Sequence, residues 1–291
     1  MTSKRTDTIE SFRQLRQRKS YSALSPLLNV MIDAAYKAGK PLIRDFGEVE
    51  KLSVTSKGAK GFVSSADLRA EKTIVDALKK ARPTYSFATE ETGDIPGEDP
   101  DSVFYVDPID GTTNFLRGIP NFAVLIACAY KNKLHAGVVY MPMYDQLIYA
   151  EKGGGAYCIS AGGTTRLRVS GHDSPMSSVI SLSMPNSFDN KGRLKRLKNI
   201  VGRLTDNPLS VRSFGLTGMN MSYTAMGKTD GGIELFYAPW DVAAPVIILR
   251  EAGGKVSTPD GSEDDMEILN GSALVNSNGL LHGFLRDVAK E

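Results

Sequence analysis

The middle of the chain contains four apolar runs that are separated only by short polar or glycine-rich turns. These runs read FAVLIACAY, LHAGVVYMPM, QLIYAEK and GAYCI, and they lie between residues 122 and 159. Apolar runs of this length are typical of strands, and turns this short join strands that are neighbours in space. The pattern predicts an antiparallel meander, which any fold of this chain has to accommodate.

Two helices are expected before the meander. Apolar residues recur at helical spacing from residue 26 to about residue 45, and this helix should end near Gly47. A second helix is expected from about residue 66 to residue 80, with Ser64 and Ser65 as N-cap candidates. The glycine- and lysine-rich segment between the two helices should form a loop or a hairpin.

Helices and strands alternate in the second half of the chain, after a passage rich in Pro, Ser and Asn near residues 174–190. The alternation predicts an α+β fold with large layered sheets, in which two subdomains share one interface. The expected elements are a basic helix at about 192–203, a strand at 209–214, a helix at about 217–226, a strand at 231–237 and a helix at 240–254 with Gly253 and Gly254 as its C-cap.

The composition is ordinary for a globular protein and does not indicate a strongly charged partner. The chain has 291 residues, of which 41% are hydrophobic and 23% are charged. Because 35 basic residues are balanced by 33 acidic ones, the net charge is only +2, and direct binding of nucleic acid is not expected. A small anionic substrate would have to be held by local groups.

The sequence predicts a cytoplasmic protein with no membrane association. It has no apolar run long enough to span a bilayer and no apolar signal-peptide segment near its start. Cys128 and Cys158 lack a C-x-x-C spacing, which favours buried free thiols in a reducing compartment. The expected organisation is a disordered basic tail at 1–22 and a single domain at 23–291, with subdomains at about 23–185 and 186–291.

The segment SVFYVDPIDGTTNF, residues 102–115, contains the most informative polar cluster. The residues before Asp107 read as a buried strand, and because Pro108 cannot donate to a ladder, the strand should stop at Asp107. Asp107 and Asp110 would then lie at a strand end, where open sheets commonly bind ligands. Taken alone, the two aspartates could equally be turn formers.

Two other acidic positions change that balance. Glu90 follows a short strand at residues 86–88, and Asp241 lies at the start of the last long helix, where it could also be a simple cap. If these residues meet Asp107 and Asp110, each close pair repels by about 4 kcal/mol at an effective dielectric of about 20, so the site requires cations. Four carboxylates would balance two divalent ions, and paired metals suit in-line attack on phosphorus.

The surrounding residue types favour magnesium. Carboxylates and a backbone carbonyl such as that of Ile109 are the oxygen ligands that Mg²⁺ prefers. The hydroxyl of Thr112 could hydrogen-bond a metal-bound water, and Gly111 would let backbone N–H groups approach a phosphate oxygen. A zinc site is not expected, because the three histidines are scattered along the chain at positions 135, 172 and 282.

These motifs resemble the inositol monophosphatase family of magnesium-dependent, lithium-sensitive phosphatases. DPIDGTTNF and WDVAAPVIILREAGG match its two signatures, the EE of ATEETG fits its upstream acidic motif, and the likeness extends from about residue 27 to residue 288. The resemblance implies a layered αβαβα sandwich, usually a homodimer, with two or three Mg²⁺ ions. It also implies hydrolysis of a phosphomonoester in one step by a metal-activated water.

The resemblance also implies a role for individual residues. Glu90, Asp107 and the Ile109 carbonyl would bind one metal, and Asp107, Asp110 and Asp241 a second. Thr112 with Glu90 would orient the attacking water, and Asp67 would support Thr112, although Asp67 could instead be a charge at a helix N-terminus. The positions implied to contact substrate are Asp110, Gly111, Thr112, Gly215, Leu216, Thr217, Glu234 and Asp241, and Glu234 could alternatively be an exposed strand residue.

Departures from the family pattern leave the substrate open. Gly61 stands where relatives usually carry an aspartate, and Leu216-Thr217-Gly218 replaces the usual Ser/Thr-Ala-Ala, which adds bulk beside the substrate. Lys57 could match a family lysine near the metals or could be solvated. Inositol 1-phosphate is the favoured substrate, and fructose 1,6-bisphosphate, histidinol phosphate and 3'-phosphoadenosine nucleotides are rivals. Some bacterial relatives bind the transcription machinery, so a regulatory role is a further alternative.

Overall fold

The computed structural model describes residues 24–56, 62–184, 191–207 and 210–290. The tail expected at residues 1–22 lies outside the described residues, as do Lys57 and Gly61.

The larger sheet has eight strands in the order β10-β9-β8-β7-β6-β5-β3-β4. The run from β6 to β10 pairs antiparallel throughout, which confirms the predicted meander and extends it by one strand. The strands are β3 (Tyr85–Thr89), β4 (Gly93–Ile95), β5 (Asp99–Asp110), β6 (Ala123–Tyr130), β7 (Lys133–Met141), β8 (Gln146–Glu151), β9 (Gly155–Ser160) and β10 (Gly163–Arg166).

Strand β5 continues past the point where the sequence predicted its end. It runs to Asp110, so the expectation that it stops at Asp107 is wrong. Asp107 pairs with Leu125 and Asp110 with Ala123, so β5 uses three steps where β6 uses two. This bulge accommodates Pro108, because a bulged residue does not have to donate to the ladder.

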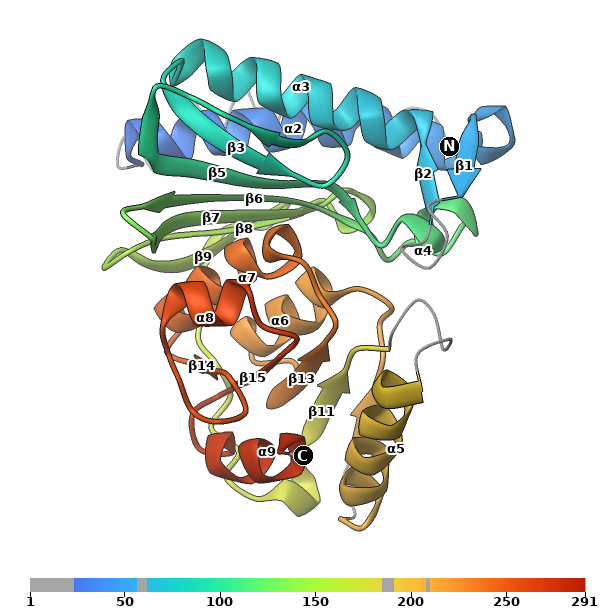
Figure 1. Ribbon diagram of the computed structural model, residues 1–291, viewed down its shortest axis with the longest axis vertical. Coiled ribbons are helices and arrows are strands. Elements are labelled where there is room, and N and C mark those ends of the chain that lie inside the picture. Colours follow the sequence, from blue (N-terminus) through green and yellow to red (C-terminus); the bar gives the residue numbers. More distant parts are fainter. Residues whose placement is uncertain (1–23, 57–61, 185–190, 208–209, 291) are drawn as a thin grey trace.

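Two long helices cover one face of the larger sheet, α2 (Pro26–Phe46) and α3 (Ser65–Ala81) (Figure 1). Both were predicted, and their caps agree with the expectation. The side chain of Ser25 caps α2, which ends at Gly47, while Ser64 caps α3. The segment between the helices contains a 3-10 turn, η2 (Val49–Lys51), and the antiparallel hairpin of β1 (Val54–Ser56) and β2 (Phe62–Ser64), which confirms the hairpin option.

The second sheet has five strands in the order β12-β11-β13-β15-β14. Strand β11 is parallel to β12 and β13, and β15 is antiparallel to β13 and β14. The strands are β11 (Val179–Leu182), β12 (Ser210–Arg212), β13 (Gly231–Leu235), β14 (Lys255–Ser257) and β15 (Ala273–Ser277). The passage near residues 174–190, which the sequence analysis placed between the two halves of the chain, therefore contains β11. The second sheet thus begins before residue 185. The expected division into subdomains at residues 185 and 186 stays a prediction.

Helices α6 (Thr217–Ala225) and α7 (Pro239–Glu251) lie between the two sheets, whereas α5 (Lys191–Thr205) and α9 (His282–Ala289) cover the outer face of the second (Figure 1). Residues 242–249 of α7 are all buried, as expected for a helix that is apolar on every side. The resulting layers, helix, sheet, helix, sheet and helix, confirm the α+β sandwich. The short helices are α4 (Thr112–Leu116), α8 (Asp265–Leu269), η4 (Pro142–Tyr144) and η5 (Pro175–Ser177).

The end of α7 differs slightly from the prediction. Its C-cap residue is Ala252, and Gly253 follows it with a φ of 91°, so Gly253 and Gly254 lie just beyond the cap. A left-handed residue after the cap is where glycine is favoured. Among the described helices, none is both long enough and apolar enough to cross a membrane.

Candidate active site

The ends of two parallel strands bring the first acidic residues together. β3 and β5 run side by side, with Thr89 opposite Val106, so the residues that follow them emerge at one edge of the sheet. The backbone N–H of Glu90 donates to the Val106 carbonyl at 3.2 Å, which continues this register by one residue. Glu90 is therefore placed beside Asp107 by strand pairing, a consequence that the sequence pattern alone did not reveal.

Glu90, Asp107, Asp110 and Asp241 interact electrostatically, and we call these four residues the acidic cluster. Burial raises the pKa of Asp107 well above its usual range, and the charges of the other three residues raise it further. Burial and the charge of Asp241 do the same to the pKa of Asp110. Burial raises the pKa of Asp241 to about 7, with a contribution from Glu90. The strand ends and the helix start therefore interact electrostatically, and the metal site that the sequence predicted there stays a prediction.

Backbone amides hold three of the four carboxylates. Asp107 Oδ1 accepts from the N–H of Ile109 at 3.0 Å, and Asp241 Oδ2 accepts from that of Ala238 at 2.8 Å. Asp110 Oδ2 accepts from the N–H of Gly218 at 2.6 Å. Asp241 therefore is a helix cap, as the simpler reading held, and is also a member of the acidic cluster.

Thr112 and Asp67 form a second contact beside the acidic cluster. The Thr112 hydroxyl lies 3.2 Å from Asp67 Oδ1 and 3.1 Å from the Ile109 carbonyl oxygen. Asp67 is fully buried and also accepts from the Ser64 N–H at 2.8 Å and from its hydroxyl at 2.6 Å. Burial raises the pKa of Asp67, the bonds from Ser64 offset part of that rise, and the charge of Glu90 adds to it. Asp67 thus caps α3 and contacts Thr112 at once.

The loop before α6 packs against the turn that precedes α4. Gly111 has a φ of 92°, and a Cβ there would lie 3.0 Å from the Asn121 carbonyl oxygen and 3.5 Å from the Leu216 side chain. Leu216 and Thr217 are both buried, with 5% and 9% of their surface exposed. The bulk of Leu216 is therefore directed mainly into the core, and the expected substrate contacts of Gly215, Leu216 and Thr217 stay predictions.

Glu234 lies in β13, near the acidic cluster. It is fully buried, so the alternative of an exposed strand residue is wrong. Its carboxylate accepts from the side-chain amides of Asn220 at 2.9 Å and Asn276 at 3.2 Å. Burial raises its pKa to about 8, and its charge contributes to the raised pKa of Asp110.

Sequence reasoning missed two polar residues beside this site, the half-buried Asn114 and the buried Glu71. The Asn114 amide donates to the carbonyls of Asn121 at 3.0 Å and Phe214 at 3.1 Å, which ties the α4 segment to the loop before α6. Glu71 accepts from two backbone amides just after Glu90. The helical pattern that places Glu71 four residues after Asp67, on the same face of α3, could have indicated it.

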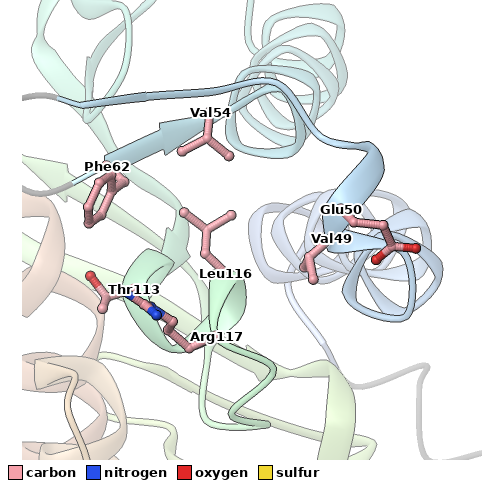
Figure 2. A pocket seen from close by; sticks show the side chains of 7 residues that line it. All are labelled: Val49, Glu50, Val54, Phe62, Thr113, Leu116 and Arg117. Carbon is pink, nitrogen blue, oxygen red and sulfur yellow. The ribbon is translucent and has the colours of Figure 1, made fainter.

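A separate cavity of about 410 Å³ adjoins this region between the β1–β2 hairpin and α4 (Figure 2). Its walls are mostly apolar, and no member of the acidic cluster lines it. The lining residues are Val49, Glu50, Val54, Phe62, Thr113, Leu116 and Arg117.

The acidic cluster fits magnesium by donor chemistry and by charge. It offers four carboxylates and the Ile109 carbonyl, all hard oxygen donors, while His172 and His282 pair with Asp230 and with two serines elsewhere. Within the part of the chain that the structure describes, no three acidic, histidine or cysteine side chains are already gathered as a metal shell. Ion binding would therefore have to draw these carboxylates closer together.

Comparisons with known proteins identify the family of this chain. The profile of the inositol monophosphatase family matches residues 23–291, and the chain belongs to this family of phosphatases. It is 43% identical to the inositol-1-monophosphatase of Mesorhizobium japonicum, over 92% of this chain and 98% of that protein. It is 38% identical to the Nus factor SuhB of Pseudomonas aeruginosa, over 84% and 89% of the two chains.

A solved structure gives the same result for the fold. The chain is similar to the extragenic suppressor protein suhB from Bartonella henselae, with a TM-score of 0.84 and 39% identity. The likeness covers 92% of this chain and 99% of that one.

Proposed function

We propose that this phosphatase is magnesium-dependent and hydrolyses inositol 1-phosphate to inositol and phosphate. The acidic cluster carries the proposal, because burial and neighbouring charges raise the pKa values of all three of its aspartates. A buried group of this kind is stabilised by cations, and the oxygen donors suit Mg²⁺. The Mesorhizobium japonicum relative, named for inositol-1-phosphate chemistry, supports this choice of substrate.

The acidic cluster would hold two ions, with a third as an option. Glu90, Asp107 and the Ile109 carbonyl would bind one ion, and Asp107, Asp110 and Asp241 the other. The bound metals supply charge neutralisation at the phosphate and a water of lowered pKa. Asp107 belongs to both sets, so we expect its loss to be tolerated least.

Thr112 and Asp67 would orient the attacking water. Thr112 has one hydroxyl proton, and when Asp67 accepts it the oxygen of Thr112 can only accept from the water. Glu90 would accept the second proton of the same water, so that a lone pair of the water points at phosphorus. Asp67 touches neither water nor substrate and acts through Thr112.

The substrate would be held opposite these groups. Gly111 lacks a side chain and would present backbone N–H groups to the phosphate. Asp110, Thr112 and Asp241 would border the ester oxygen and the nearest hydroxyl. The segment Gly215 to Thr217 and Glu234 would shape the remainder of the polyol pocket, with Glu234 moving from its buried position to accept a hydroxyl.

We further propose that the enzyme is a cytoplasmic homodimer, that lithium inhibits it by taking a magnesium position, and that it does not bind nucleic acid directly. The net charge of +2 supports the last statement. A second candidate function is binding to the transcription machinery, which the likeness to the Nus factor SuhB favours. The two roles are compatible.

Phosphate release from a substrate panel tests the proposal. The panel consists of inositol 1-phosphate, fructose 1,6-bisphosphate, histidinol phosphate and 3'-phosphoadenosine 5'-phosphate, each with and without Mg²⁺ and Li⁺. We expect magnesium-dependent, lithium-inhibited turnover with a preference for inositol 1-phosphate. Preference for another ester would correct the substrate, and no turnover of any would favour the binding role.

A further inference from the structure

Glu71 is a buried carboxylate that has no place in the chemistry described so far. It lies in α3 and exposes only 2% of its surface. Glu71 Oε2 accepts from the backbone N–H of Glu91 at 2.8 Å, and Oε1 accepts from that of Thr92 at 2.9 Å. These amides belong to the turn between β3 and β4, some twenty residues further along the chain.

The turn that Glu71 holds is the one that carries Glu90. On its other side, the N–H of Glu90 donates to the Val106 carbonyl of β5 at 3.2 Å. The Thr89 hydroxyl donates to the Gly93 carbonyl at 3.0 Å and closes the turn. The backbone that carries Glu90 is thus fixed to the sheet on one side and to a helix on the other.

Only a carboxylate suits this task. Two consecutive backbone amides offer two donors and no acceptor, and an ionised carboxylate offers two oxygen acceptors and no donor. A glutamine would satisfy one amide and direct its own N–H groups at the other. Burying a carboxylate is costly unless both oxygens are paired, so its presence indicates that the position of the turn matters.

The same face of α3 also reaches Thr112. Asp67 and Glu71 are four residues apart, so they lie one above the other on the helix. Asp67 Oδ1 lies 3.2 Å from the Thr112 hydroxyl, and Glu71 accepts a hydrogen bond from the backbone of the turn after Glu90. One helix therefore sets the positions of both Thr112 and Glu90, the two residues that would orient the attacking water.

We propose that Glu71 is a positioning residue, which holds Glu90 at the metal site and in register with Thr112. This inference rests on the proposed function of Glu90 as a metal ligand. Glu71 touches neither metal nor substrate and acts only through the backbone of residues 91 and 92.

The test compares Glu71→Gln with Glu251→Gln. Glu251 is a matched control, because its carboxylate also accepts from two backbone amides, those of Gly153 and Gly155, each at 2.8 Å. Gly153 lies in the β8–β9 turn and Gly155 begins β9, and Glu251, which is half-buried, is at the opposite end of α7 from Asp241. Mn²⁺ binding, followed by loss of the free-ion paramagnetic resonance signal, gives a readout that is independent of turnover.

We expect Glu71→Gln to weaken Mn²⁺ binding, and to raise the Mg²⁺ concentration for half-maximal turnover, by about tenfold to a hundredfold. The KM for substrate at saturating Mg²⁺ should change by less than about twofold, because the lost interaction does not involve substrate. Glu251→Gln should lower the melting temperature but leave both metal readouts unchanged. Glu71→Asp keeps the charge and both acceptors and should lie between wild type and Glu71→Gln.

Wild-type metal affinity in Glu71→Gln, at a melting temperature lowered as in Glu251→Gln, would overturn the inference. If Glu71→Gln does not fold, the same comparison is made with Glu71→Asp, and unchanged Mn²⁺ affinity there would overturn it equally. Glu90→Gln separates this failure from failure of the proposed function. Unaltered Mn²⁺ binding in Glu90→Gln would refute the metal assignment itself, whereas weakened binding in Glu90→Gln alone would refute only the role of Glu71.

Discussion

Two acidic regions lie close together in this protein, and they are built differently. Glu234 in β13 has one carboxylate, and two asparagine amides donate to it. The acidic cluster has four carboxylates, and one backbone amide donates to each of its three aspartates. Glu234 is a single buried carboxyl whose pKa burial raises to about 8, whereas the residues of the acidic cluster also repel one another, and protons or cations can offset that repulsion. The difference supports the proposal that metal ions bind at the acidic cluster.

The largest expected effect is that of Asp110→Asn. The change removes one charge from the acidic cluster but keeps a group that can accept from the Gly218 amide. Loss of a metal ligand costs several kcal/mol of transition-state stabilisation, so kcat/KM should fall on the order of a thousandfold. The melting temperature of the metal-free protein should not decrease, because a repulsive charge is lost.

Glu234→Gln is the matched control for that comparison. It also replaces a buried acid by its amide, but at the site where two amide donors already satisfy the carboxylate. Initial rates should show a KM that is raised by at most about tenfold, which corresponds to the free energy of one lost hydrogen bond. The Mg²⁺ requirement should not change. Near wild-type turnover in Asp110→Asn, or an equal collapse in both variants, would contradict the distinction between the two regions.

A smaller effect is expected from Gly218→Ala, which alters the acidic cluster without touching its charge. A Cβ at this position would lie 2.5 Å from Asp110 Oδ2 and 2.8 Å from the side chain of Leu125. We expect a loss of unfolding free energy of about 1–3 kcal/mol, together with weaker Mg²⁺ binding by calorimetry, because Asp110 has to move. Gly202→Ala is the control, since a Cβ there meets nothing within 4 Å. Unaltered Mg²⁺ affinity in Gly218→Ala would show that the position of Asp110 is not critical.

The last prediction concerns the pH dependence of stability without metal. Burial and neighbouring charges hold the pKa values of Asp107 and Asp110 well above their usual range, and burial and Glu90 raise that of Asp241 from 3.8 to about 7. Such groups bind protons more tightly in the folded state than in the unfolded state. The stabilisation that they give is therefore complete at a pH below their pKa in the unfolded state, and it is lost as the pH rises through their pKa in the folded state.

Denaturant unfolding should therefore give a free energy that falls, on the order of a few kcal/mol, from about pH 4 to about pH 8 in metal-free protein. Saturating Mg²⁺ should reduce this slope, because the ions replace the protons of the acidic cluster, while the contribution of Glu234, whose pKa burial raises to about 8, should remain. A metal-free stability that increases over the same range would mean that the acidic cluster is already neutralised by other groups.

Periodic features of the fold could be predicted from the sequence, and long-range pairings could not. The meander and helices α2 and α3 follow from local patterns with clear caps at Ser64 and Gly47. Strand β11 was missed because its four residues lie in a Pro- and Ser-rich passage and gain their order from pairing with β12 and β13. The continuation of β5 through Pro108 was missed because a bulge depends on the partner strand.

The same division applies to the site. Motif spacing indicated the acidic cluster, and strand register then explains how Glu90 reaches Asp107. Two features were not predicted: the burial of Glu234, and the hydrogen bonds that Glu71 accepts from the backbone of residues 91 and 92. Both depend on contacts between segments far apart in the sequence, for which a single sequence carries little signal. Asp67 and Asp241 show that a carboxylate can accept a hydrogen bond at a helix start and also lie at the candidate site.

The most direct test of the central claim is anomalous diffraction from crystals of this protein grown with Mn²⁺. We predict one peak at a coordination distance of about 2.1 Å from oxygens of Glu90, Asp107 and the Ile109 carbonyl, and a second at the same distance from Asp107, Asp110 and Asp241. Absence of any peak within the acidic cluster at saturating Mn²⁺ would contradict the account.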